Sequence, residues 1–255
     1  MSLFKQEFYK LQHKRSTWGA FSLLVGLMAF LAVVSRRESS ATRLFYVTSA
    51  YAGFQWIALL VIVISATCVT MEFDYGTIKQ LALQTGRRRT IFWIKYDFVI
   101  LICTCLHLAV IGVTWGLKNS VSPQLHWSQM YQYHQNLIQL LVHNAELSLY
   151  GCLLIISLTF CLASFGHSSG VSTTLSLGFC FLGEGLSALI LRTVGQHYLF
   201  LRWNPFNMLN LQNEYGNPAY SQTTRLTLMQ LAIGNLGWTL VFLIIGSYVF
   251  SHRRI

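Results

Sequence analysis

Charged residues are scarce in this chain of 255 residues: they make up 10% of it, whereas apolar residues make up 54%. A soluble domain usually carries about 25% charged residues, so the composition argues against a protein surrounded by water. Proline is also rare, with three residues, and few positions therefore interrupt a long helix. The apolar residues form runs that reach the roughly 20 residues needed to cross a bilayer as a helix.

A nucleotide-binding P-loop is absent as well, because no G-x-x-x-x-G-K-[ST] pattern occurs in the sequence. That loop holds phosphates with its backbone N–H groups and its lysine. We therefore expect no ATP site and no other cofactor on this chain. The run His143-Asn144-Ala145-Glu146 differs from the H-E-x-x-H of a zinc protease, and we expect no metal site either.

The apolar runs predict an all-α integral membrane protein with a single transmembrane domain over residues 1–255. Six spans are expected, at residues 17–35, 46–70, 92–117, 146–165, 171–191 and 229–250. Before them, residues 1–15 carry Phe4, Phe8 and Leu11 at helical spacing beside lysines, which favours an interfacial helix on the membrane surface. An ordinary basic tail is the alternative. The polar and aromatic residues 192–228 are expected to fold back as a lid over the outer mouth.

The net charge of +10 could suit a nucleic-acid partner. The positive charges sit in the short joints between apolar runs, however, where such charge sets the orientation of a membrane protein. We therefore expect the chain to lie in a lipid membrane and to have no nucleic-acid partner. With both termini in the cytoplasm, eleven of the eighteen Lys and Arg residues lie inside. The sequence thus predicts a multi-pass protein of the cell membrane with cytoplasmic termini.

Residues 72–90, here named the junction, join the second and third expected spans and combine charged residues with an apolar helix face. Gly76 permits a sharp chain reversal, and Thr77 can cap a short helix that follows it. Ile78, Leu81 and Ala82 would share one face of that helix, and an apolar face in a charged loop needs a cover. Residues 87–89 are three arginines that can bind acidic groups or lipid phosphates. A plain basic loop that only sets the orientation is the alternative.

The junction, followed by Lys95, resembles the same region of the permease subunits of type-2 ABC exporters. In that family a glutamate ends the second span, a Gly-Thr pair opens a short coupling helix, and basic residues lead into the third span. The resemblance implies a separate cytosolic ATPase, expected in two copies that hold ATP and Mg²⁺, and a second copy of this chain or a related permease. It also implies a helical segment, re-entrant or extracellular, between spans five and six, export of a peptide or lipophilic compound, and a bacterial source. The residues expected to couple to the ATPase are Glu72, Tyr75, Gly76, Thr77, Ile78, Lys79, Leu81, Arg87, Arg88 and Arg89.

Polar residues inside the spans are candidates for a transport pathway. Glu184 is the only acid well inside a span, and a charge there should face a bundle interior, a water-filled cavity or a partner. The alternative is that the fifth span ends early and Glu184 begins a re-entrant segment. Gln55 and Trp56 in the second span lie at a similar depth to Asn235 and Trp238 in the sixth. These four residues either line one cavity or serve in packing between helices.

Two other classes of function stay open. An intramembrane enzyme needs paired acids, a metal set or a Ser/Lys dyad facing one cavity, and no such set is evident in the spans. A membrane sensor or accessory protein without transport would need no ATPase.

Overall fold

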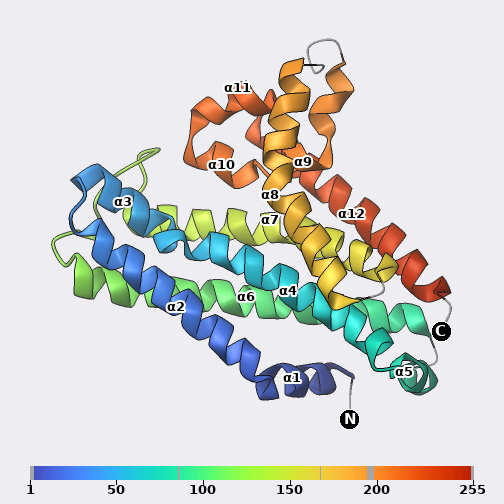
Figure 1. The fold of residues 1–255 in the computed structure, drawn as a ribbon. Coiled ribbons are helices and arrows are strands. Elements are labelled where there is room, and N and C mark those ends of the chain that lie inside the picture. Colours follow the sequence, from blue (N-terminus) through green and yellow to red (C-terminus); the bar gives the residue numbers. More distant parts are fainter. Residues whose placement is uncertain (1–2, 86, 167, 194–197, 254–255) are drawn as a thin grey trace. The chain divides into compact units, whose positions relative to one another are not determined.

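The computed structural model describes residues 3–85, 87–166, 168–193 and 198–253, and these residues are mainly helical (Figure 1). Within them, the extended backbone pairing is confined to one isolated bridge between Met130 and Asn136. The helices are α1 (Leu3–His13), α2 (Arg15–Ser35), α3 (Ser40–Thr48), η1 (Ala50–Ala52), α4 (Gly53–Asp74), α5 (Ile78–Thr85), α6 (Arg88–Val121), α7 (Leu137–Phe165), α8 (Ser169–Thr193), η2 (Leu199–Trp203), α9 (Pro205–Met208), α10 (Leu211–Gly216), η3 (Pro218–Tyr220), α11 (Ser221–Thr224) and α12 (Leu228–His252).

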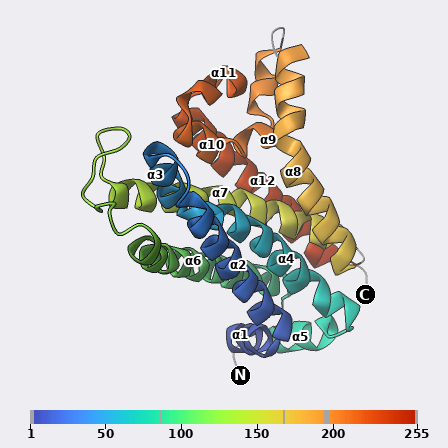
Figure 2. The same cartoon turned by 60° about the vertical axis from the view of Figure 1, so that its left-hand side comes forward.

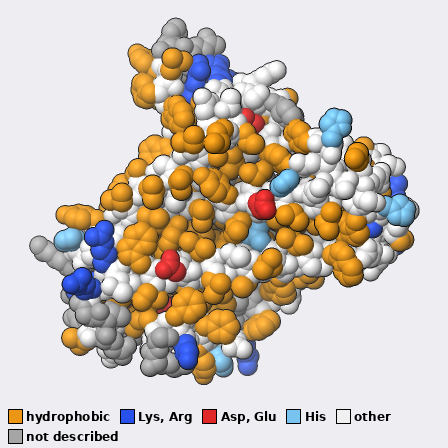
Figure 3. Space-filling view, turned by 180° about the vertical axis from the view of Figure 1, so that it is seen from behind, with side chains coloured by type: hydrophobic (Ala, Val, Ile, Leu, Met, Phe, Trp, Pro, Cys, Tyr) orange, Lys and Arg blue, Asp and Glu red, His pale blue; other side chains and the backbone are white. Residues whose placement is uncertain are grey.

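Five helical stretches of the described residues are long and apolar enough to cross a membrane: Arg15–Ser35, Ala50–Asp74, Arg88–Val121, Leu137–Phe165 and Leu228–His252. The two parts of α8, Ser169–Gly183 and Gly185–Thr193, meet at an angle of 47° and add a sixth stretch if they count as one span; a bend of this size fits a broken span or a re-entrant loop. Figure 3 shows one face of the molecule, on which apolar side chains predominate and acidic ones are sparse. The chain is therefore an all-α integral membrane protein, as the sequence predicts.

The second span begins later than the sequence predicts. Residues 46–48 belong to α3, and Ala50, Tyr51 and Ala52 then take positive φ angles of 54°, 49° and 60° before α4 starts at Gly53. The span expected at residues 46–70 corresponds to Ala50–Asp74 in the structure, because an apolar run does not reveal a left-handed turn of the backbone. A Cβ atom on Gly53 would lie 2.7 Å from Val110, so α4 starts where it packs closely on α6.

Two other spans are longer than the apolar runs. The third was expected at 92–117 and is formed by α6 (Arg88–Val121), and the fourth was expected at 146–165 and is formed by α7 (Leu137–Phe165). Both helices continue through polar and basic residues at their ends, because backbone hydrogen bonding does not depend on hydropathy. The other spans differ from their expected bounds by a few residues.

The described chain divides into two compact units, Met1–Leu60 with Leu101–Leu149 and Val61–Ile100 with Tyr150–Ile255. In the first unit, His107 of α6 stacks on Phe54 with ring centroids 5.8 Å apart. The imidazole Nε2 lies 3.1 Å from the Ser148 hydroxyl, and Nδ1 lies 2.8 Å from the Cys103 carbonyl oxygen. These contacts give His107 the role of a packed, hydrogen-bonded side chain between α6 and α7.

The second unit has an aromatic core. The Phe92 ring of α6 contacts Phe160 of α7 and Phe250 of α12, at centroid distances of 5.4 and 5.7 Å. Away from this core, α9 packs on both α8 and α12 (Figure 2). Phe206 of α9 lies so close to Gly183 that a Cβ there would be 2.5 Å from its ring. Residues 199–224 therefore form an ordered set of short helices, fastened to the two long helices at glycine positions.

Candidate functional site

The junction reverses the chain between α4 and α6 through a turn and the short helix α5 (Figure 1). Gly76 has a φ of 66°, a left-handed conformation that glycine adopts without a steric penalty. Its N–H donates to the Phe73 carbonyl over 3.2 Å, while the Tyr75 N–H donates to the Met71 carbonyl over 3.0 Å. These bonds close the end of α4, so the chain turns within a few residues and α5 starts at Ile78.

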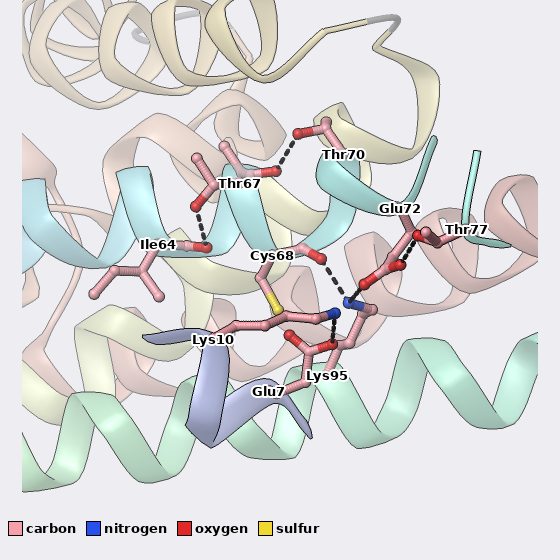
Figure 4. A network of polar contacts seen from close by, with 10 residues as sticks. Glu7, Lys10, Ile64, Thr67, Cys68, Thr70, Glu72, Thr77 and Lys95 are labelled. Carbon is pink, nitrogen blue, oxygen red and sulfur yellow. Dashed lines mark hydrogen bonds and ion pairs between the residues drawn. The ribbon is translucent and has the colours of Figure 1, made fainter. Parts of the chain in front are cut away.

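A buried ion pair joins the two long helices that the junction connects. The Lys95 ammonium of α6 lies 3.1 Å from Oε1 of Glu72 in the last turn of α4, and the side chains are 1% and 3% exposed. Lys95 also donates a hydrogen bond of 2.8 Å to the Cys68 carbonyl oxygen (Figure 4). A buried charge is costly unless it is paired and hydrogen-bonded, and Lys95 meets both conditions.

Thr77 links the short helix to this ion pair. Its hydroxyl donates a hydrogen bond to Oε2 of Glu72 (Figure 4), and its carbonyl accepts from the Leu81 N–H over 3.1 Å. The sequence suggested Thr77 as a cap for the helix, whereas the structure shows its hydroxyl bonded to α4. One carboxylate oxygen of Glu72 therefore contacts Lys95 of α6, and the other accepts from Thr77, the residue that directly precedes α5.

The helix α5 has a buried side and an exposed side. Ile78 and Leu81 are 0% and 6% exposed, so they form the buried side of the helix. Leu83 is 86% exposed, and Tyr75, just before the helix, is 73% exposed. The side chains of Lys79 and Ala82, which the sequence analysis also named, lie outside the described residues. The exposed apolar side chains of Leu83 and Tyr75 are the ones free to meet a partner.

Two of the three junction arginines contact α12 and the residue after it. Arg88 donates to the Arg253 carbonyl oxygen over 2.9 Å, and Arg89 donates to the Ser247 hydroxyl over 3.3 Å. Arg87 is exposed. We expected all three arginines to be available to acidic groups or lipid phosphates. In the structure Arg88 and Arg89 have contacts within the chain, and both Arg87 and Arg89 are exposed.

Arg253 is a part of the site that sequence reasoning missed. Its guanidinium lies 4.0 Å from the centroid of the Phe73 ring and donates to the Ser164 carbonyl over 3.4 Å. Burial lowers the pKa of Arg253, while the nearby Asp74 carboxylate acts in the opposite direction. A cation over an aromatic face is attractive, so Arg253 holds the ends of α4 and α7 together. The only signal in the sequence is a basic residue after the last span.

The candidate pathway residues belong to different compact units, and the residues of each unit are considered separately. In the first unit Gln55 is exposed, and Trp56 is half-buried with an indole N–H that has no acceptor among the described residues. In the second unit Trp238 donates to the Trp203 carbonyl over 2.7 Å, and Asn235 is 1% exposed. Glu184 lies at the bend of α8, and its side chain is outside the described residues.

Metal chemistry finds no support in the described part of the chain. No group of three or more His, Cys, Asp or Glu side chains gathers there in a way that could hold an ion. The polar groups of the junction bind one another, so they hold the helices together. The exposed side chains Tyr75 and Leu83 are then held in place for contact with a partner.

Two comparisons with known proteins bear on this site. The family model described as "ABC-2 family transporter protein" matches residues 3–183, a range that includes the whole junction. The uncharacterized membrane protein YdbK of Bacillus subtilis (strain 168) is 42% identical over 60 residues. That stretch covers 23% of this chain and 24% of the relative, so the likeness concerns a quarter of either protein.

Proposed function

Because this chain belongs to the ABC-2 family of transporter proteins, we propose that it is the permease subunit of an exporter driven by ATPases on separate chains. Its many apolar helices make it a multi-pass membrane protein, which is the setting that such a permease requires. Beyond membership of the family, we propose that transport runs outward, that separate ATPase chains drive it, and that these chains contact a defined part of the surface.

The observation that carries the proposal is the bonding of the junction. A force applied to α5 reaches α4 through Thr77 and Glu72, and it reaches α6 through Glu72 and Lys95. Charges paired away from water interact more strongly than they do at a surface, so this connection resists separation. A loop that only set the membrane orientation would need its positive charge but no buried pair.

The partner surface proposed here consists of Tyr75, Leu83 and Arg87. Two of them are exposed apolar side chains, which lose contact with water when a partner covers them. Arg87 adds a cation that suits an acidic group on that partner. We place this surface and both termini in the cytosol, where two ATPase chains would bind ATP and Mg²⁺. A second copy of this chain or a related permease would complete the pathway in a bacterial cell membrane.

The cargo proposed here is a peptide or a lipophilic compound. The charged residues that the sequence places inside spans are few, so a strongly charged cargo would lack partners along the pathway. In the second unit, Glu184, Asn235 and Trp238 are the residues proposed for this pathway; in the first unit, they are Gln55 and Trp56. Export that is unchanged in both Glu184→Gln and Glu184→Ala would remove Glu184 from the pathway.

Purification of the tagged chain from its native membranes tests the ATPase partner. We expect an ATPase with a P-loop to co-purify, and we expect Leu83→Asp to reduce its recovery because a carboxylate would replace an apolar contact. Met130→Asp is the matched control, since Met130 is 69% exposed in the loop between α6 and α7, outside the junction. Equal recovery from both variants would argue against docking at the junction. Full activity without any ATPase would favour a sensor, an accessory protein or an enzyme.

A further inference from the structure

The helix α12 holds two buried polar side chains that lack hydrogen-bond partners. Asn235 is 1% exposed, and neither its Oδ1 nor its Nδ2 has a partner among the described residues. Thr239, one helical turn later, is 4% exposed, and its hydroxyl is likewise without a partner in the described part. Side chains four residues apart lie on the same face of a helix, so these groups form one patch, here named the Asn235–Thr239 pair.

Other threonines show that the chain can satisfy such groups from its own backbone. Thr70 donates to the Ala66 carbonyl over 2.9 Å, and Thr114 donates to the Val110 carbonyl over 2.8 Å. Thr239 makes no such bond within the described residues. Buried polar groups are nearly always hydrogen-bonded, and an exception inside a membrane span is costly. Within the described residues, the Asn235–Thr239 pair therefore has no hydrogen-bond partner, and a bound group is needed to provide one.

The surroundings of the pair favour an uncharged ligand. Between Leu228 and His252 the sequence contains no Asp, Glu, Lys or Arg. The neighbouring contacts on α12 are also neutral: the Tyr150 hydroxyl donates to the Ala232 carbonyl over 2.8 Å, and Met208 lies against Gly234. The helix α12 itself therefore offers no counter-charge to a charged ligand. The unpartnered atoms include both a donor and an acceptor, which is the complement of an amide group.

We propose that the Asn235–Thr239 pair binds a backbone amide of an exported peptide. Nδ2 of Asn235 would donate to the peptide carbonyl, and Oδ1 would accept from the peptide N–H. Thr239 would add a hydrogen bond to the next peptide group. This inference rests on the proposed exporter function, and it narrows the cargo to peptides.

Asn235 is buried, so a peptide can reach it only if a neighbouring element moves. The short helix α9 is that element. A Cβ atom on Gly234 would lie 2.2 Å from Sδ of Met208, so α9 covers α12 directly beside Asn235. Displacement of α9 is the movement that opens this part of α12. The flexible thioether of Met208 suits a contact that must form and break.

The test uses the full chain in lipid nanodiscs without ATPase or nucleotide. The probe is N-acetyl-tetraleucine amide, and its copy with every backbone nitrogen methylated lacks the N–H donors. Thermal unfolding and peptide affinity are measured for the wild type, Asn235→Leu and Asn207→Leu. Asn207 is the matched control, because it is also 1% exposed but donates to the Arg202 and Thr224 carbonyls over 2.8 and 2.9 Å.

Opposite effects on stability and binding are expected. Asn235→Leu should raise the Tm by about 2–4 °C, because it removes unsatisfied polar atoms from a buried position. It should also weaken the affinity for the peptide about tenfold, as expected for the loss of hydrogen bonds to a ligand. Asn207→Leu should lower the Tm. The methylated peptide should bind the wild type as weakly as the unmodified peptide binds Asn235→Leu.

Three results would overturn the proposal. The first is a fall in Tm for Asn235→Leu like that of Asn207→Leu, which would mean that Asn235 is a satisfied structural residue. The second is equal peptide affinity in the wild type and Asn235→Leu, the result expected if ordered water alone meets the pair. The third is equal binding of the two peptides, or no binding of either. All these measurements omit the ATPase, so failure of the proposed ATPase docking remains a separate result.

Discussion

The carboxylate of Glu72 contacts the ammonium of Lys95 over 3.1 Å across the two helices that the junction joins. The two residues are 23 positions apart in the sequence and nearly fully buried, so the pair fixes how the ends of α4 and α6 meet. The Thr77 hydroxyl binds the same carboxylate. One acidic side chain therefore joins three helices at the surface that we propose for the ATPase.

Breaking this pair on one side should destabilise the protein strongly. Glu72→Gln removes the carboxylate that lies 3.1 Å from the buried Lys95 ammonium, and Lys95→Met removes that cation from beside the buried Glu72 carboxylate. Each should cost about 3–5 kcal/mol, seen as a lower Tm in nanodiscs. The double variant Glu72→Gln/Lys95→Met should recover most of the loss, because it leaves neither charge unpaired and keeps an acceptor for the Thr77 hydroxyl. Additive losses in the double variant would contradict the pairing.

The Thr77 hydroxyl should contribute more to the stability of the junction than the Thr77 methyl group does. Thr77→Val removes the hydrogen bond to Glu72 at almost constant volume and should cost about 1.5–3 kcal/mol, the range for bonds to charged groups. Thr77→Ser keeps the hydroxyl and should stay close to the wild type. Hydrogen exchange of residues 76–85 is the sensitive measurement, since α5 loses its bond to α4. Equal protection in the two variants would show that the hydroxyl does not hold α5.

Gly76 should tolerate asparagine better than alanine. Its φ of 66° costs an ordinary L-residue roughly 1–2 kcal/mol, whereas asparagine visits this region more readily. Gly76→Ala should therefore reduce recovery of the co-purified ATPase more than Gly76→Asn does. A reversed order would mean that space, and not backbone conformation, selects glycine here.

Arg253 should hold the junction in place from the end of α12. Arg253→Ala removes the cation over Phe73 and the bond to Ser164, with an expected loss of about 1–2 kcal/mol. Faster hydrogen exchange at residues 71–76 is the local sign of that loss. His252→Ala is the control, because His252 is exposed at the neighbouring position. The assignment fails if both variants exchange at the same rate.

Two glycines of α12 should respond in opposite ways to alanine. A Cβ atom on Gly246 would lie 3.0 Å from the Cys161 Cα of α7, so Gly246→Ala should cost about 1–3 kcal/mol through overpacking. Gly237 has no neighbouring atom within 4 Å of such a Cβ. Gly237→Ala should be neutral or gain about 0.5–1 kcal/mol from better helix propensity. The Tm values of the two variants in nanodiscs provide the comparison.

Much of the fold is predictable from hydropathy because the bilayer imposes a simple rule. Backbone groups in hydrocarbon must be hydrogen-bonded within the chain, so a long apolar run becomes a helix. That rule predicts the all-α class and the approximate place of the spans. It does not reveal the left-handed turn at Ala50–Ala52, which lies within one apolar run. It also does not reveal the bend of α8, where the sequence left two readings of Glu184 open.

The amino-acid sequence alone identifies a helical membrane protein with a charged junction, since composition and local residue order decide which segments enter the bilayer. Glycine at position 76 also predicts the chain reversal, because the preference is local. Tertiary packing pairs Glu72 with Lys95, places Arg253 over Phe73, and buries Asn235 with no hydrogen-bond partner among the described residues. These outcomes depend on which helix faces come together, and the residues concerned lie far apart in the chain. The local sequence pattern does not predict that arrangement, because helix packing depends on the contacts of all the helices together.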